Sequence, residues 1–112
     1  MDFTTKRCVP CEGGVPKMTP PQVEEGLRSL DGWDAREGST QLHKHYRFKD
    51  FRRAMAFVNA MADLAEDEGH HPDFTVHYSN VDVTLWTHAI GGLSENDFIV
   101  AAKLDRLPAA RA

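Results

Sequence analysis

Residues 66–97 of the chain read EDEGHHPDFTVHYSNVDVTLWTHAIGGLSEND. Glycine is the residue that most often follows the last turn of a helix, so a helix is predicted to end at Gly69. Apolar and polar side chains then alternate on both sides of Ser79-Asn80, which predicts a β-hairpin. Ser94 and Asp97 form a capping-box pattern that predicts the start of a last helix. The stretch therefore joins a helix, a hairpin and a helix.

The predicted hairpin pairs Phe74–Tyr78 with Val81–His88. A two-residue turn at Ser79-Asn80 places Tyr78 opposite Val81, and the side chains then separate into two faces. The apolar face holds Phe74, Val76, Tyr78, Val81, Val83 and Leu85. The polar face holds Thr75, His77, Asp82 and Thr84.

The remaining elements follow from capping residues, turn residues and apolar spacing. They are a helix from Thr19 to Asp31-Gly32, strands Trp33–Glu37 and Gln41–Phe48, a helix from Asp50 to Gly69, and a last helix from Ser94 to Leu107-Pro108. Strands joined as hairpins are antiparallel, so we predict an α+β fold in the order α-β-β-α-β-β-α. Its four-stranded antiparallel sheet is expected to carry three helices on one face. Residues 19–112 are expected to form this single domain after an extended segment over 1–18.

The long central helix has a predicted apolar stripe and an unusual end. The stripe comprises Phe51, Met55, Val58, Ala62 and Ala65, thickened by Ala54, Met61 and Leu64, with Phe57 at its margin. Its last turns carry Asp63, Glu66, Asp67 and Glu68. Acidic residues at the C-terminal end of a helix oppose its dipole. A site that needs a carboxylate would explain them, and so would a solvated acidic face.

The bulk composition excludes several classes of protein. Hydrophobic residues make up 41% and charged residues 27% of the 112 residues, as in ordinary globular proteins. The formal net charge is −4 without a basic block, so no nucleic-acid partner is expected. No apolar run approaches the roughly 20 residues that cross a bilayer, and the N-terminus lacks the apolar core of a signal peptide. We therefore expect a cytoplasmic protein with no membrane partner.

Cys8-Val9-Pro10-Cys11 is a C-x-x-C pair. A structural zinc site needs four ligands, and no second cysteine pair supplies the other two. No strand or thioredoxin-like pattern surrounds the pair, so two reduced thiols are the expected state.

Three histidines are predicted to gather beside the hairpin. Extending its pairing places His71 opposite His88 and next to Trp86, although Pro72 is expected to interrupt the ladder of hydrogen bonds. Their proximity does not depend on the pairing itself.

Two carboxylates flank these histidines in the prediction. Glu66 lies four residues before His70, so the two meet on one helix face, where a carboxylate can orient an imidazole. Asp97 approaches from the start of the last helix. Imidazoles titrate near neutrality and can transfer protons in both directions, which favours an acid–base site.

Each of these residues also has a structural explanation. His70 can cap the helix end, Asp97 completes a capping box, and Trp86 can be a surface or interface aromatic. Zinc ligands are available in Glu66, His70, His71 and His88. Their spacing is not HExxH and adjacent histidines seldom face one ion, so no metal is expected. His43 and His45 are interpreted as the solvated face of a strand rather than as ligands.

The combined pattern resembles the signature of the pterin-4a-carbinolamine dehydratases, over residues 16–107. The matching signature is Glu66-x3-His70-His71-Pro72, an aromatic residue, Thr87-His88 and Asp97. Further similar segments are Leu30-Asp31-Gly32-Trp33, Phe48-Lys49-Asp50-Phe51 and Gly92-Leu93-Ser94-Glu95, and the C-x-x-C lead-in is similar to bacterial members.

The resemblance implies an activity and an assembly. The expected reaction removes water from 4a-hydroxytetrahydrobiopterin and gives quinonoid dihydropterin, which recycles the cofactor of aromatic amino-acid hydroxylases. The expected partner is a pterin substrate, with neither metal nor organic cofactor. The resemblance further implies a homodimer or homotetramer. Some animal relatives also act as transcriptional coactivators, a role that no residue here indicates.

The resemblance also implies a role for each residue of the signature. His70 and His88 are expected to act as acid and base, with Glu66 orienting His70 and Asp97 supporting His88. The residues expected to contact the substrate are His71, Pro72 and Trp86.

Two alternatives to this activity remain open. One is a non-catalytic binding or assembly module that keeps the pocket, although such a module has no need of three convergent histidines. The other is an enzyme acting on a different pterin, such as one related to the molybdenum cofactor.

Overall fold

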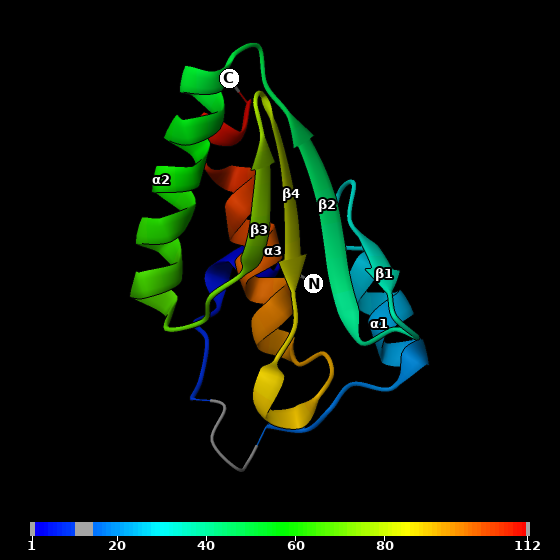
Figure 1. Cartoon of the computed structure of the whole chain (residues 1–112). Coiled ribbons are helices and arrows are strands. Elements are labelled where there is room, and N and C mark those ends of the chain that lie inside the picture. Colours follow the sequence, from blue (N-terminus) through cyan, green and yellow to red (C-terminus); the bar gives the residue numbers. More distant parts are fainter. Residues whose placement is uncertain (1, 11–14, 112) are drawn as a thin grey trace.

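The computed structural model describes residues 2–10 and 15–111, and Figure 1 shows its elements. The helices are α1 (Pro20–Leu27), α2 (Phe51–Glu68) and α3 (Glu95–Arg106). The strands are β1 (Asp34–Arg36), β2 (Gln41–Arg47), β3 (Asp73–His77) and β4 (Asn80–Leu85). Short 3-10 helices are η1 (Phe3–Thr5), η2 (His88–Ile90) and η3 (Pro108–Arg111). Cys11 lies outside the described residues, so the state of the C-x-x-C pair stays a prediction.

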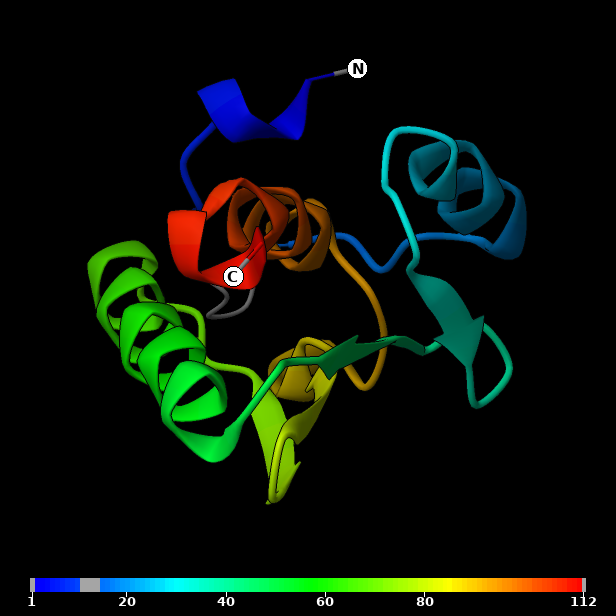
Figure 2. The same cartoon turned by 90° about the horizontal axis from the view of Figure 1, so that it is seen from above.

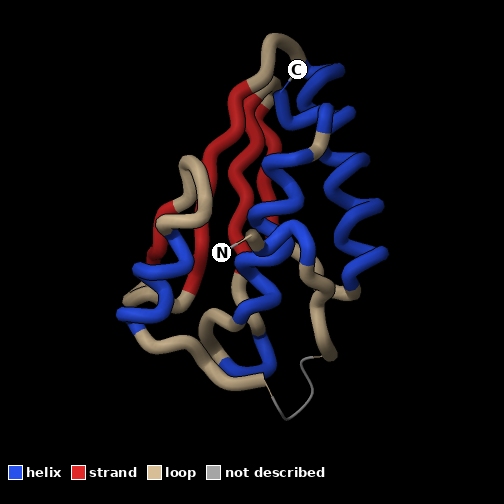
Figure 3. Tube along the Cα trace, turned by 180° about the vertical axis from the view of Figure 1, so that it is seen from behind, coloured by secondary structure: helices blue, strands red, loops and turns tan. Residues whose placement is uncertain are grey.

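The strands form one antiparallel sheet in the order β1-β2-β4-β3. The helices α1, α2 and α3 lie on the same side of this sheet (Figure 2). Seen from behind, the shorter helices face the viewer and the long helix α2 stands to the right of the strands (Figure 3). The predicted α+β fold and its element order are therefore confirmed.

Capping residues define the helix boundaries much as their chemistry predicts. Thr19 and Gln22 form a reciprocal capping box at the start of α1. The side chain of Asp50 accepts a hydrogen bond from the backbone N–H of Arg53 at the start of α2. Gly69 ends α2 with a φ of 67°, a left-handed conformation that glycine adopts at little cost.

The register of the β3–β4 hairpin differs from the predicted one. The turn is formed by Tyr78 and Ser79, so that His77 pairs with Asn80 and Val76 pairs with Val81. Tyr78 has a φ of 57° in this turn. The pairing is displaced by two residues, and a displacement of two keeps every side chain on its face. The alternation of apolar and polar residues could therefore define the faces but not the turn.

The two strands of the hairpin are buried to different extents. The β4 side chains of Val81, Val83 and Leu85 are fully buried, because β4 is an inner strand. Phe74 and Tyr78 are 45% and 70% exposed because they lie on or next to the edge strand β3.

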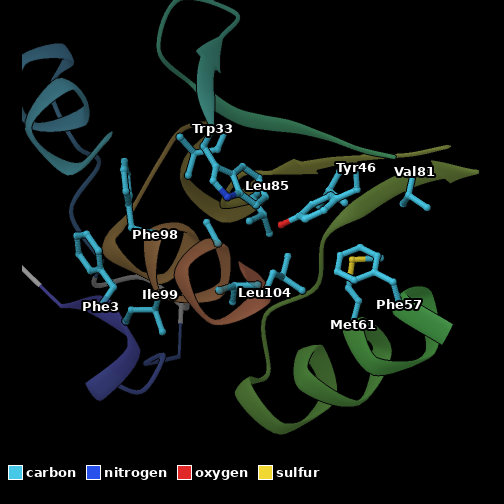
Figure 4. Close-up of a cluster of buried hydrophobic side chains, with 14 of the residues drawn as sticks. Phe3, Trp33, Tyr46, Phe57, Met61, Val81, Leu85, Phe98, Ile99 and Leu104 are labelled. Carbon is cyan, nitrogen blue, oxygen red and sulfur yellow. The ribbon is translucent and has the colours of Figure 1, made fainter. Parts of the chain in front are cut away.

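The buried face of α2 also differs from the predicted stripe. Phe57, predicted at the margin, is fully buried, whereas Phe51 is 50% exposed. The ring of Phe57 packs against Tyr46 and Phe48, with centroid distances of 4.5 and 5.3 Å. Figure 4 shows Phe57 and Met61 pointing from α2 toward Tyr46 and Val81 of the sheet. Packing against Tyr46 of β2 and against Phe48, which directly follows β2, therefore sets the rotation of α2.

The N-terminal segment contributes to the core. Phe3 is 5% exposed, and its ring lies 5.5 Å from that of Phe98 in α3. The sequence predicts only an extended segment over 1–18, because a single aromatic residue has no periodicity to detect. Residues 6–10 and 15–18 do lack helix and strand.

We predict that Phe57→Ala lowers the free energy of unfolding by about 3–5 kcal/mol, because it leaves a cavity in the core. Phe51→Ala on the same helix is the matched control, with an expected loss below about 1 kcal/mol. Equilibrium urea unfolding followed by circular dichroism measures both. Equal losses would contradict the observed rotation of α2.

Candidate acid–base site

A cavity of about 340 Å³ lies where α2 leads into β3 and β4 leads into η2. In Figure 1 the start of β3 and the end of β4 meet at the same end of the sheet. The lining residues are Gly69, His70, His71, Pro72, Asp73, Trp86, Thr87, His88 and Ala89. The cavity thus brings together all three candidate histidines, Pro72 and Trp86.

His70 and Asp97 form the buried part of this site. Asp97 is fully buried and His70 is 6% exposed. His70 donates from Nε2 to Oδ1 of Asp97 at 2.6 Å. The other oxygen, Oδ2, accepts from the Thr87 hydroxyl at 2.8 Å and from the Ser94 backbone N–H at 3.0 Å. The capping role and the imidazole contact of Asp97 therefore coexist.

His71 and His88 form the exposed part, with side chains 60% and 61% exposed. His71 donates from Nε2 to the carboxylate of Glu66. The His88 ring stacks on Trp86, with centroids 4.0 Å apart and planes inclined by 30°.

The carboxylates are paired differently from the prediction, which assigned Glu66 to His70 and Asp97 to His88. Gly69 reverses the chain, and the backbone N–H of His70 bonds to the carbonyl of Ala65 at 3.2 Å. His70 thus lies outside α2, where the spacing rule for helical neighbours no longer holds. Its side chain turns inward to Asp97, and His71 reaches back to Glu66.

No strand pairing joins His71 and His88, in agreement with the expected interruption of the ladder at Pro72. Strand β3 begins only at Asp73, after Pro72, and β4 ends at Leu85. The two histidines are instead brought to one cavity by the segments that follow α2 and β4.

Sequence reasoning missed two residues of the site, Thr87 and Asp73. Thr87 is 1% exposed and bonds to both Asp97 and Ser94. The feature of the sequence that could have identified Thr87 is its position directly before His88 in the signature. Asp73 lies against Trp86 and His88, and its only signal is its place after Pro72.

Two of the acidic residues at the end of α2, Asp67 and Glu68, form ion pairs with the N-terminal segment and α3. The Glu68 side chain is buried and accepts hydrogen bonds from the Cys8 backbone N–H at 2.9 Å and from Lys103. Asp67 accepts from Arg7 at 3.1 Å. Burial alone would raise the pKa of Glu68, but these hydrogen bonds and the charges of Lys103 and Arg7 hold it below its ordinary value.

The thiol of Cys8 lies in the same half-buried environment. Burial, and then the negative charge of Glu68, raise the pKa of Cys8 to about 12. A protonated thiol of this kind is a poor nucleophile and a poor metal ligand.

His43 and His45 of β2 do not line the cavity, although they lie on the same face of the sheet as Asp73. Both approach the same oxygen of Asp82, at 3.1 and 2.9 Å. The hydrogen bond from His45 holds the pKa of Asp82 below its ordinary value. Within residues 2–10 and 15–111, no group of three or more His, Cys, Asp and Glu residues is arranged to hold a metal ion.

A second cavity, of about 460 Å³, lies beside β2, but its polar groups serve the fold. Asp105 accepts hydrogen bonds from Lys44 at 2.8 Å, Tyr46 at 2.6 Å and Trp33 at 3.0 Å. Burial, and then the contact with Asp105, raise the pKa of the Tyr46 hydroxyl. The acid–base chemistry is therefore assigned to the smaller cavity.

A cavity lined by imidazoles that contact carboxylates is suited to moving protons to and from a small molecule. The chain matches the family model described as Pterin 4 alpha carbinolamine dehydratase over residues 16–107. It belongs to the pterin-4a-carbinolamine dehydratase family. Enzymes with this name are hydro-lyases.

Relatives in bacteria and plants match almost the whole chain. A protein of Nitrosospira multiformis that carries the family's name is 50% identical over 106 residues, which cover 95% of this chain and 92% of that protein. Pterin-4-alpha-carbinolamine dehydratase 2, mitochondrial, of Arabidopsis thaliana is 46% identical over 110 residues, covering 95% of this chain and 59% of that protein. In the described part of this chain, no helix is both long and apolar enough to span a membrane.

Two solved structures share the fold. A transcriptional coactivator/pterin dehydratase from Brucella melitensis is 37% identical, with a TM-score of 0.78 over 81% of this chain and 97% of that one. A pterin dehydratase-like protein identified as a RuBisCO assembly factor in the alpha-carboxysome is 26% identical, with a TM-score of 0.59 over 68% of this chain and 88% of that one.

We predict that Glu68→Gln removes a pH-dependent part of the stability. The pKa of Glu68 is lowered on folding, so its carboxylate stabilises the fold above the unfolded pKa of about 4.3, and this contribution is lost as the pH falls further. At pH 7 the variant is expected to lose about 1–3 kcal/mol in free energy of unfolding. Urea unfolding at pH 7 and pH 3 should show the gap between wild type and variant closing in acid. A gap of equal size at both pH values would contradict the ion pairs assigned to Glu68.

Proposed function

We propose that the protein dehydrates 4a-hydroxytetrahydrobiopterin to quinonoid dihydropterin and water. The observation that carries the proposal is the buried hydrogen bond between His70 and Asp97 at the wall of a cavity that also contains His71 and His88. The names of relatives up to 50% identical support the same activity.

The reaction requires one proton donor and one proton acceptor. The bond between C4a and its hydroxyl oxygen breaks when an acid protonates that oxygen, and water leaves. A base takes the proton of the neighbouring ring nitrogen, whose electron pair forms the new double bond to C4a. The acid has then lost one proton and the base has gained one, so the enzyme returns to its initial state when the acid takes up a proton from solvent and the base releases one.

We assign the acid and base roles to His70 and His88. Asp97 fixes the ring orientation of His70, as the third group of an acid–base system does. His88 also lines the cavity, next to the Trp86 ring. His71, held by Glu66, binds the pterin, and Trp86 with Pro72 contacts the flat ring system.

The proposed setting is pterin recycling. The substrate is the product of aromatic amino-acid hydroxylases, and a reductase restores the tetrahydropterin after dehydration. We place the protein in the cytoplasm as a homodimer or homotetramer, with no metal or organic cofactor.

One observation favours a second candidate function. The structural relative that serves as a RuBisCO assembly factor shares this fold at 26% identity. A binding role without catalysis is therefore one alternative, and activity on a different pterin is another. An activity assay must distinguish both from dehydration of 4a-hydroxytetrahydrobiopterin.

We predict that wild type accelerates the decay of chemically generated 4a-hydroxytetrahydrobiopterin, followed by absorbance. His70→Ala and His88→Ala should each lower kcat/KM by about 100-fold, or until the rate meets that of buffer, since acid–base groups contribute at least this much. His77→Ala is the matched control, because His77 is exposed on β3 outside the cavity.

Two outcomes would redirect the proposal. A wild-type rate equal to that of buffer rejects dehydration of this substrate and favours the binding module or another pterin. Loss of activity on adding a chelator to the wild type would show a metal requirement that the proposed mechanism lacks.

A further inference from the structure

We propose that Asp73 is a positioning residue that fixes Trp86 and His88 relative to the substrate, a role that rests on the proposed dehydration. Its Oδ2 accepts a hydrogen bond from Nε1 of Trp86 at 3.2 Å. The same oxygen lies 3.6 Å from Nε2 of His88. One carboxylate oxygen therefore contacts both the aromatic wall and one of the proposed proton-transfer groups.

The hairpin register brings Asp73 to this place. Asp73 is the first residue of β3 and pairs with Thr84 of β4. Trp86 follows Thr84 by two residues and projects from the same face, so it is the diagonal neighbour of Asp73. The register predicted from the sequence instead pairs Asp73 with Trp86 directly.

Stacking extends the restraint from Trp86 to His88. The two rings lie 4.0 Å apart and are inclined by 30°, so a rotation of the indole displaces the imidazole. His88 follows the end of β4, and its backbone belongs to η2 rather than to the sheet. The side-chain contacts with Trp86 and Asp73 therefore restrain a ring that the sheet does not hold.

Solvent exposure limits the strength of each contact. The side chains of Asp73 and His88 are 63% and 61% exposed, and ion pairs at such exposure contribute little on their own. The effect of Asp73 is geometric, because the hydrogen bond, the charge contact and the ring stacking select one arrangement of two side chains. The other ionisable groups that line the cavity are His70 and His71.

Two substitutions separate the two contacts of Asp73. Asp73→Asn keeps an oxygen that accepts from the Trp86 indole but removes the negative charge beside His88, and Asp73→Ala removes both. Asp73→Ala should lower kcat/KM about three- to tenfold, through a higher KM and a lower kcat. Asp73→Asn should restore the KM of wild type and leave kcat reduced. Glu24→Ala, which removes an exposed carboxylate on α1, is the matched control and should change neither.

A second measurement needs no substrate. A protonated imidazole stacked on an indole quenches its fluorescence, so the emission of Trp86 should be lower in acid, where His88 is protonated. Subtracting the emission of Trp86→Phe removes the contribution of the buried Trp33. The quenching should be lost in Asp73→Ala and retained in Asp73→Asn.

These measurements distinguish failure of the inference from failure of the proposed function. Wild-type kcat/KM and wild-type quenching in Asp73→Ala would overturn the positioning role. If wild type shows no dehydration, the proposed function fails, and loss of quenching in Asp73→Ala would still support the restraint that Asp73 places on Trp86 and His88. Thermal melting verifies that each variant is folded. If Asp73→Ala does not fold, the kcat of Asp73→Asn is compared with that of wild type instead, and an unchanged kcat would overturn the role of the charge beside His88.

Discussion

The buried carboxylate of Asp97 is the constraint on which the geometry of the site depends. Its two oxygens accept hydrogen bonds from the segment after α2, the segment after β4 and the start of α3. A buried carboxylate is costly unless hydrogen bonds satisfy it, so the three segments are stable only when they are assembled together. The same interactions that complete the helix cap therefore build the inner wall of the cavity. Folding and site formation are one event in this part of the molecule.

Elements with local chemical signals could be predicted from the sequence. The capping box at Thr19, the cap at Asp50 and the left-handed Gly69 all lie where their residue types indicate. The two faces of the hairpin also follow from alternation. The residues of the signature converge on one cavity or contact its histidines, because the elements that carry them end at the same edge of the fold.

The sequence-based predictions were wrong where a local pattern is compatible with two structures, or where tertiary packing determines the structure. The hairpin turn was misplaced by two residues, since both registers keep valines inside and polar residues outside. The rotation of α2 depends on the packing of Phe57 against Tyr46 and Phe48. No periodicity within the helix sequence reveals this packing. The pairing of carboxylates with histidines follows from the chain reversal at Gly69, which directs consecutive side chains in opposite directions.

The three imidazoles of the site differ in their surroundings although each meets a carboxylate. His70 and its partner are buried, whereas His71 with Glu66 and His88 with Asp73 lie at the mouth of the cavity. Burial holds the His70–Asp97 pair in one geometry, whereas the side chains at the mouth of the cavity are in contact with solvent. In the proposed reaction, His70 acts inside the cavity and His88 acts at its mouth.

The contacts of the N-terminal segment affect where the folded domain begins. The family model matches residues 16–107, yet Phe3 lies in the core and the Cys8 backbone N–H donates a hydrogen bond to the buried Glu68. Glu68 directly precedes the Gly69 reversal that orients His70 and His71. The family model thus covers less of the chain than this protein uses to fold, and that model alone would set the domain boundary too late.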